Sequence, residues 1–250
     1  MSQDNDYQVL IVGDSASGKS ASLEFLKDPE GVMYLNCEAG KKIPFKSKFE
    51  VKGEASNKGH VITDPLQVYT AFEQAEEMEH IHTIVIDGLN YLMDMYESVH
   101  VRTSNDSRTK WGDYGEFFRK LVQHYFTNSS KKIICIAHTH TEQVESDGEV
   151  KLNSSVPIKG AMRGKVESYF SVILQAKVVP LSKLKSQKKE LLEITELEKT
   201  KGFKYVFQTT IDKGSMHEKM RGPRMMWDSD EIFIDNDCQK VLNRLHEFYS

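Results

Sequence analysis

Short apolar runs of strand length alternate along the chain with amphipathic stretches of helix length. Apolar, β-branched runs bounded by turn residues are typical of strands that are buried on both faces. They predict strands over Tyr7–Val12, Val32–Cys37, Thr83–Ile86 and Ile133–Ala137, and a fifth strand within Tyr169–Val179. Because helical stretches separate these strands, we expect an α/β fold with a mainly parallel central sheet flanked by helices.

Four stretches carry helical signals. A helix is expected from about Lys19 to Leu26, directly after a glycine-bearing turn. Another begins at Asp64-Pro65, because Asp can cap free N–H groups and Pro suits the first helical position. Apolar residues recur with the helical period over Trp111–Phe126, and Asn236–Tyr249 is expected to close the chain with a helix.

The pattern changes after Pro180. Leu191–Leu197 and Phe203–Ile211 flank the turn-like sequence Lys199–Gly202, which predicts an antiparallel hairpin rather than another strand–helix unit. We therefore predict one domain over residues 1–250, with a core at about residues 7–180 and a hairpin and C-terminal helix at residues 181–250.

The 250-residue chain carries 33 Lys+Arg against 37 Asp+Glu, a formal net charge of −4. This balance excludes a generally basic nucleic-acid coat, although not a local basic patch. The sequence has no apolar run near the roughly 20 residues of a membrane helix, and Met1–Asp6 lacks the features of a signal peptide. The three cysteines cannot all pair, which favours a reducing compartment. We expect a cytoplasmic protein without a membrane partner.

Residues 13–20 fit the pattern G-x-x-x-x-G-K-[ST] at every fixed position. Glycines allow such a loop to wrap around an anion, so that successive backbone N–H groups point at phosphate oxygens. The Lys19 ammonium is expected to reach the outer phosphates, and the Ser20 hydroxyl to ligate Mg²⁺. The sequence therefore predicts a nucleotide-binding loop made of Gly13, Asp14, Ser15, Ala16, Ser17, Gly18, Lys19 and Ser20.

Two carboxylates end neighbouring predicted strands. Asp87 follows Thr83–Ile86 directly, at the carboxyl end where doubly wound sheets place ligand groups, and we expect it to complete the magnesium site with Ser20. Residue 88 is Gly, so no glutamate follows Asp87 to activate water. Glu38, which terminates the second strand, is the candidate catalytic base, because it can orient a water and accept its proton.

His138 terminates the fourth predicted strand. A polar side chain there can contact the terminal phosphate and report its loss to the following loop, so we expect His138 to belong to the catalytic site. The spacing of Cys135, His138 and His140 also permits a zinc interpretation. Strand alternation sends Cys135 and His138 to opposite faces, however, and this disfavours zinc.

The order of these motifs resembles that of RecA-like P-loop ATPases. The strand leading into Gly13–Ser20, the Glu38 strand, the Asp87 strand and the His138 strand follow one another as in that family. The chain is most similar to phage-encoded members with an AAA domain that are associated with single-strand annealing and recombination. The resemblance implies hydrolysis of ATP with Mg²⁺, action on single-stranded DNA in recombination, annealing or repair, and the host cytoplasm where the protein is phage-encoded.

The resemblance also implies positions for individual segments. It places the His138 strand between the Gly13 and Asp87 strands, and it directs the loop Thr139–Lys159 toward DNA. RecA-like proteins commonly assemble as homo-oligomers in which cations from the neighbouring subunit complete the site. Lys219-Met220-Arg221 looks like such an element, and the resemblance therefore implies that Lys219 and Arg221 are catalytic in trans.

Two segments are candidates for the DNA contact. The loop after His138 has mixed charge, with Glu142, Glu145, Asp147 and Glu149 before Lys151 and Lys159. Phosphate binding is driven by clustered cations, which are found instead at Lys183, Lys185, Lys188 and Lys189. The same lysines are also typical of a solvated strand edge that is protected against aggregation.

Two alternative functions use the same phosphate loop. A small-molecule or nucleotide kinase needs an arginine-bearing lid, which Leu89–Asp113 could supply with Arg102 and Arg108. A GTPase switch needs an Asp-x-x-Gly segment and an Asn/Thr-Lys-x-Asp guanine reader. Asp87 is followed by Gly-Leu-Asn, and no guanine reader is present, so the GTPase is the least favoured alternative.

Overall fold

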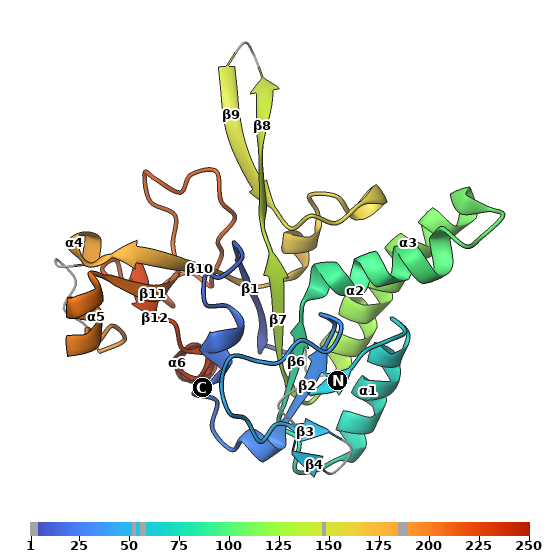
Figure 1. The fold of residues 1–250 in the computed structure, drawn as a ribbon, viewed down its shortest axis with the longest axis horizontal. Helices are drawn as coiled ribbons and strands as arrows, with labels where there is room; N and C mark the ends of the chain where they lie inside the picture. The colour runs from blue at the N-terminus through green and yellow to red at the C-terminus, as the bar shows by residue number, and fades with distance from the viewer. Residues whose placement is uncertain (1–4, 52–53, 56–58, 147–148, 185–189) are drawn as a thin grey trace.

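A computed structural model of the chain describes residues 5–51, 54–55, 59–146, 149–184 and 190–250. One large sheet dominates these ranges. Its strands are β1 (Gln8–Gly13), β2 (Val32–Asn36), β3 (Glu50–Val51), β4 (Glu54–Ala55), β5 (His60–Val61), β6 (Thr83–Asp87), β7 (Lys132–His138), β10 (Val172–Pro180), β11 (Phe203–Gln208) and β12 (Phe233–Asp235). Their spatial order is β12-β11-β10-β1-β7-β6-β2-β3-β4, and β5 pairs with β2 (Figure 1).

Helical segments connect these strands. The α-helices are α1 (Gln67–Glu77), α2 (Leu89–Tyr96), α3 (Ser107–Lys120), α4 (Leu181–Leu184), α5 (Glu196–Lys201) and α6 (Cys238–Tyr249). The 3₁₀ segments are Ser20–Leu23, Pro29–Gly31, Gly160–Met162 and Val166–Tyr169, and wider π-type turns extend α2 over Glu97–Val101 and α3 over Leu121–Phe126. Within the described ranges, no helix is both long and apolar enough to cross a membrane.

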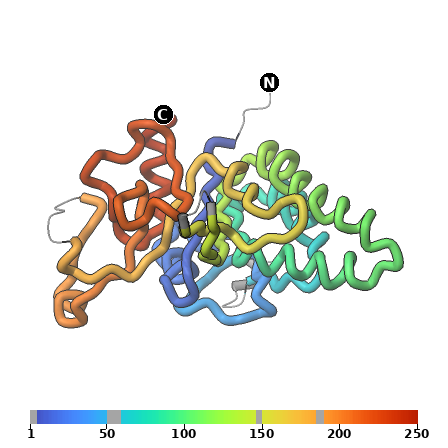
Figure 2. Tube along the Cα trace, turned by 90° about the horizontal axis from the view of Figure 1, so that it is seen from above, coloured from blue at the N-terminus to red at the C-terminus, as the bar shows by residue number. Residues whose placement is uncertain are grey.

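The five strands β10, β1, β7, β6 and β2 are mutually parallel, and both of their faces are buried. Side chains alternate between the faces, as period-two geometry requires. Leu10 and Val12 pack in the cluster that contains α1, α2 and α3, whereas Val9 and Ile11 pack in the cluster that contains α6. Figure 2 shows these two helical layers on either side of the sheet. The predicted α/β fold, with a mainly parallel central sheet flanked by helices, is thus confirmed.

The pairing register aligns the ends of the strands that carry the motifs. Gly13 at the end of β1 is opposite His138 at the end of β7, and Asn36 at the end of β2 is opposite Asp87 at the end of β6. β7 lies between β1 and β6, as the family resemblance implied. Because parallel strands end at the same edge, the residues that follow them gather there. We call this edge the carboxyl edge.

The structure corrects the predicted C-terminal hairpin. Antiparallel strands are present there, but β11 pairs with β10 and β12, not with Leu191–Leu197. Most of the second half of that segment belongs to α5 and its cap. Thr195 and Glu198 form a reciprocal capping box at the start of α5, and Gly202 ends the helix in the left-handed conformation (φ +79°). The Thr-x-x-Glu spacing was the signal for a helix.

The helix expected from Lys19 to Leu26 is also shorter than predicted. Only Ser20–Leu23 is helical, and it is a 3₁₀ segment. The other helical predictions are confirmed with small changes at their ends, at α1, α3 and α6.

A two-stranded antiparallel hairpin of β8 (His140–Ser146) and β9 (Glu149–Ser155) projects from the carboxyl edge (Figure 1). Only Thr139 separates β7 from β8, so the hairpin continues directly from the strand that carries His138. Its described apolar side chains Val144, Val150 and Leu152 are exposed. The predicted loop Thr139–Lys159 is therefore largely this hairpin.

Candidate active site

A cavity of about 880 Å³ lies at the carboxyl edge. The phosphate loop and the ends of β2, β6 and β7 line one end of it, and α5, β11 and the start of α6 line the other. The predicted site residues Lys19, Ser20, Glu38, Asp87 and His138 lie on its wall, and Lys41 lies beside them. Four separate segments of the sequence therefore contribute these side chains to one site.

The backbone of the phosphate loop requires glycine at two positions. A Cβ at Gly13 would lie 2.6 Å from the Ala176 carbonyl oxygen and 2.7 Å from Ser17 Oγ, which is closer than packed atoms approach. Gly18 has φ +94°, and a Cβ there would lie 2.9 Å from the Tyr205 ring. Glycine is the residue that accepts both the close approach and the left-handed conformation. The sequence motif thus matches a sterically demanding loop.

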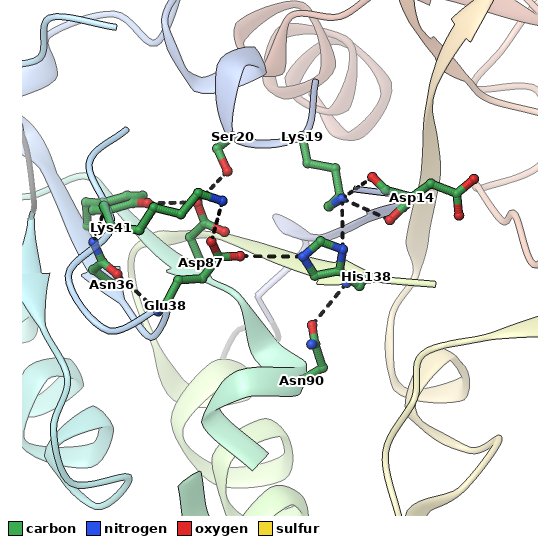
Figure 3. Close-up of polar contacts among 11 residues, drawn as sticks. Asp14, Lys19, Ser20, Asn36, Glu38, Lys41, Asp87, Asn90 and His138 are labelled. Atoms are coloured by element: carbon green, nitrogen blue, oxygen red, sulfur yellow. Dashed lines mark hydrogen bonds and ion pairs between the residues drawn. The ribbon is translucent and has the colours of Figure 1, made fainter. Parts of the chain in front are cut away.

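Lys19 turns back onto the loop that precedes it (Figure 3). Its Nζ donates hydrogen bonds to the carbonyl oxygens of Gly13 (2.9 Å) and Asp14 (2.6 Å), and it lies 3.5 Å from His138 Nδ1. Burial lowers the pKa of Lys19 to about 8, although the nearby carboxylates oppose this shift. An incoming phosphate would supply the negative charge that this buried ammonium lacks.

Asp87 is almost completely buried, and its two oxygens are used differently. Oδ2 accepts hydrogen bonds from Ser20 Oγ and from the Tyr34 hydroxyl, each at 2.7 Å. Oδ1 is buried and has no hydrogen-bond partner among the described residues. Burial raises the pKa of Asp87, because it disfavours the charged carboxylate. An orphaned carboxylate oxygen beside a serine hydroxyl fits Mg²⁺, a cation that prefers oxygen ligands.

Tyr34 was not among the residues predicted from the sequence. It lies in the middle of β2, is 2% exposed, and lines the cavity. A Cβ at Gly59 would lie 2.0 Å from the Tyr34 ring, so glycine at position 59 leaves the room that the ring occupies. A tyrosine within an otherwise aliphatic buried strand needs a partner for its hydroxyl, and that was the available signal.

Glu38 is positioned by a tight turn after β2. The Glu38 N–H donates to Asn36 Oδ1 (3.0 Å), and Asn36 Nδ2 donates to the Lys41 carbonyl oxygen (2.8 Å). Ala39 and Gly40 both have left-handed φ angles, of +53° and +74°. Asn36 thereby ties the two ends of the turn together, and the Glu38 carboxylate faces the cavity. Asn36 is a positioning residue that the sequence did not reveal.

The Glu38 carboxylate lies between two basic groups. Its Oε2 accepts a hydrogen bond from Lys41 Nζ at 2.9 Å, and its Oε1 lies 3.6 Å from His138 Nε2 (Figure 3). The His138 backbone N–H donates to Asn90 Oδ1 at 3.0 Å. Burial, followed by the charge of Lys19, lowers the pKa of His138, which favours the neutral imidazole. Cys135 packs in the core on the helical face and does not join this group.

The structure does not bring Lys219 and Arg221 into this cavity. Lys219 Nζ lies 3.4 Å from Glu167 Oε2, and Arg221 Nη1 lies 3.5 Å from the Ser168 carbonyl oxygen. The Arg221 backbone also pairs with Ile173 in β10. Neither cation is among the described residues that line the cavity. Their action in trans therefore stays a prediction.

Other candidate segments also lie apart from the cavity. Leu89–Asp113, the lid of the kinase alternative, folds as α2, its π-type extension and the start of α3. Arg102 in this segment donates to Glu97 Oε1 at 2.8 and 3.0 Å, and it is not among the described cavity residues. In the lysine cluster, Lys183 is exposed in α4, whereas Lys185, Lys188 and Lys189 lie outside the described residues.

A model of the AAA domain family matches residues 5–210, which is most of the chain. The chain belongs to the AAA domain family. No curated protein matches it. Among solved structures, a KaiC-like protein from the hyperthermophilic archaeon Pyrococcus horikoshii OT3 is similar, with 10% identity and a TM-score of 0.43 over 87% of this chain and 83% of that one. The AAA domain assignment, together with the phosphate loop, indicates a P-loop ATPase.

Proposed function

We propose that this AAA domain is a Mg²⁺-dependent ATPase that hydrolyses the terminal phosphate of ATP in the cavity at the carboxyl edge. One observation carries the proposal. Lys19, Glu38, Asp87 and His138 come from four segments of the chain, yet they converge at one end of a single cavity beside a phosphate-binding loop. A convergence of a cation, a base and a metal-binding carboxylate supports phosphoryl transfer to water.

The geometry suggests a role for each group. Backbone N–H groups of the loop and the Lys19 ammonium hold the outer phosphates, and Ser20 and Asp87 hold the metal. Bound Mg²⁺ supplies positive charge that offsets the charge of the phosphate oxygens. Glu38 orients a water molecule and accepts its proton. His138 contacts both Lys19 and Glu38, so it is placed to respond when the terminal phosphate leaves.

The end of the cavity that lies away from the catalytic groups supports a position for the nucleoside. The catalytic groups occupy the end beside β6 and β2, so the nucleoside would extend across Gly18 toward β11 and α6. Tyr205 and Asn236 line that end, and Asn236 Nδ2 donates to the Gly18 carbonyl oxygen at 2.9 Å. The cavity therefore offers room for a base and a ribose beyond the phosphates.

The direct test measures nucleotide binding and phosphate release by the purified chain. We expect ATP to bind, phosphate to be released only when Mg²⁺ is supplied, and GTP to compete poorly. The absence of ATP binding at millimolar nucleotide would contradict the proposal. Preferential binding of GTP would instead favour the switch alternative, and transfer of phosphate to an acceptor detected by mass spectrometry would favour the kinase.

We further propose that the ATPase acts on single-stranded DNA in recombination, annealing or repair, as a homo-oligomer. The family resemblance supports this role, and so does the direct connection of His138 through Thr139 to the β8–β9 hairpin. A ligand on the hairpin would thus be mechanically linked to the phosphate site. The test is ATP turnover with and without single-stranded DNA. If the DNA neither binds nor alters turnover, this role is wrong even where hydrolysis persists.

A further inference from the structure

Lys41 is a second cation at the catalytic end of the cavity, and neither the motif nor the family assignment gives it a role. It follows Glu38 by three residues and lies on the same turn, which Asn36 closes. Its Nζ is 2.9 Å from Glu38 Oε2, and it lines the cavity. Figure 3 shows its side chain extending from the turn toward the centre of the site, on the opposite side from Lys19.

The two partners of this ion pair differ in exposure. The Lys41 side chain is 71% exposed, whereas the Glu38 side chain is 14% exposed. Ion pairs with an exposed member are weak and exchange readily, because water and other ions compete for the charge. A terminal phosphate carries more negative charge than one carboxylate, and it would lie within reach of the same ammonium. Lys41 can therefore leave Glu38 and pair with the terminal phosphate when a triphosphate binds.

Lys41 is also coupled to the other charged groups of the site. Lys41 interacts with the charges of both Glu38 and Asp87, and its positive charge also acts on Lys19 and His138. The Lys41 ammonium is therefore close enough to act on the charged groups of the site although its side chain is exposed. With Lys19 at one side and Lys41 at the other, two cations of the same chain flank the position of the terminal phosphate.

We propose that Lys41 is a catalytic residue that holds Glu38 before nucleotide binds and moves to the terminal phosphate when ATP binds. This inference rests on the proposed ATPase function. The move stabilises the charge of the transferred phosphoryl group, and it frees the Glu38 carboxylate to act as a base. ADP lacks the third phosphate that would attract Lys41, so Glu38 stays paired with Lys41 until a triphosphate is bound.

The proposed hydrolysis transfers the terminal phosphoryl group from ATP to water, with Glu38 as the base. The water oxygen forms a bond to the terminal phosphorus while the bond from that phosphorus to the bridging oxygen breaks. The bridging oxygen keeps the electron pair and leaves as part of ADP. One proton of the water passes to Glu38, which later releases it to solvent. Lys41 returns to Glu38 when the phosphate departs.

The first test compares Lys41→Ala with wild type in binding and turnover. Fluorescent ADP and a non-hydrolysable ATP analogue report affinity, and phosphate release reports kcat. We expect kcat to fall about 100-fold, as when one transition-state donor is removed. Affinity for the triphosphate should fall about 10-fold, while affinity for ADP stays within about twofold. Lys41→Arg keeps the charge and should restore most of the activity.

Lys48→Ala is the matched control, since Lys48 is 72% exposed and forms a comparable ion pair with Glu30 at 3.4 Å. It should leave both affinities and kcat unchanged. Equal losses of ADP and triphosphate affinity in Lys41→Ala would overturn the proposal, because they would show a general structural role. An unchanged kcat would overturn it as well.

A double-mutant cycle tests whether Lys41 moves from Glu38 to the terminal phosphate. Removing the Glu38 charge frees Lys41, so Glu38→Gln should tighten binding of the triphosphate analogue about two- to fivefold, the range of an exposed ion pair. In the Lys41→Ala background the same change should have no such effect. If Glu38→Gln changed binding of the analogue equally in wild type and in Lys41→Ala, the proposed move of Lys41 from Glu38 to the phosphate would be wrong. A wild-type chain that bound no ATP would overturn the proposed function and this inference together.

Discussion

Two pairs of cations in this chain have very different surroundings. Lys19 and Lys41 line the cavity, where they contact the carbonyl oxygens of the phosphate loop and the Glu38 carboxylate. Lys219 and Arg221 lie beside the first residues of β10, where they contact the segment that contains Glu167 and Ser168. Both pairs follow short, suggestive sequence patterns, yet the fold brings only the first pair to the acids of the site.

This difference separates the cations that one chain places in its own site from those that only a neighbouring subunit could supply. In the proposed mechanism, the cavity pair holds a triphosphate and stabilises its charge without a partner. Lys219 and Arg221 contact residues outside the cavity of their own chain. They could therefore act on nucleotide only in the site of a neighbouring subunit. Four substitutions test this division, and they are ordered by the size of the expected effect.

The largest effect is expected for Glu38→Gln. The amide can hold a water but cannot accept its proton, so kcat should fall about 10²- to 10⁴-fold, the usual contribution of a general base. ATP binding should persist, and this separation of binding from turnover identifies the base. Phosphate release in single-turnover conditions is the measurement. Wild-type turnover in Glu38→Gln would show that another residue activates the water.

Lys19→Ala removes the ammonium that faces the outer phosphates. Hydrogen bonds to charged groups contribute about 1.5–3 kcal/mol, so ATP affinity should fall about 10- to 100-fold. Equilibrium binding of fluorescent ATP checks this. Lys110→Ala, which removes a lysine paired with Asp113 on α3, is the control and should bind normally. Equal affinity in Lys19→Ala and wild type would remove Lys19 from the phosphate site.

Tyr34→Phe tests the hydroxyl that orients Asp87. Partners that orient a metal ligand contribute about 10-fold or more to metal affinity, so the Mg²⁺ concentration for half-maximal turnover should rise about 10-fold. Mn²⁺ binding followed by paramagnetic resonance gives a readout that is independent of turnover. Tyr69→Phe is the control, because the Tyr69 hydroxyl donates to the Phe117 carbonyl oxygen instead. The same metal affinity in both variants would show that Ser20 alone orients Asp87.

Arg221→Ala is expected to have the smallest effect on the isolated chain. Its guanidinium lies outside the cavity, so ATP affinity should stay within about twofold of wild type, as for other substitutions away from the site. Turnover should fall only at protein concentrations where chains associate. Phosphate release measured over a dilution series distinguishes the cases. A loss of turnover that is independent of dilution would contradict action in trans.

Two predicted elements differ from the structure. Leu191–Leu197 has the composition of a strand, but its last residues belong to α5 because the Thr195–Glu198 capping box favours a helix over a strand. Capping contacts, which hydrophobic periodicity does not record, determined the local structure there. The predicted helix at Lys19–Leu26 is only the 3₁₀ segment Ser20–Leu23, and nothing in its hydrophobic pattern gave that length.

The sequence by itself determined the parts whose chemistry is local. The phosphate loop depends on consecutive backbone groups, and Asp87, Glu38 and His138 were identifiable because each lies where a buried strand ends. Only the tertiary structure decided which neighbours these groups have. Tyr34, Asn36 and Lys41 act through side-chain contacts made across strands or within a turn, and a linear pattern carries no distance between such groups. For the same reason, the burial that leaves Asp87 Oδ1 without a hydrogen-bond partner in the described part of the chain became visible only when β2, β6 and the loop were packed together.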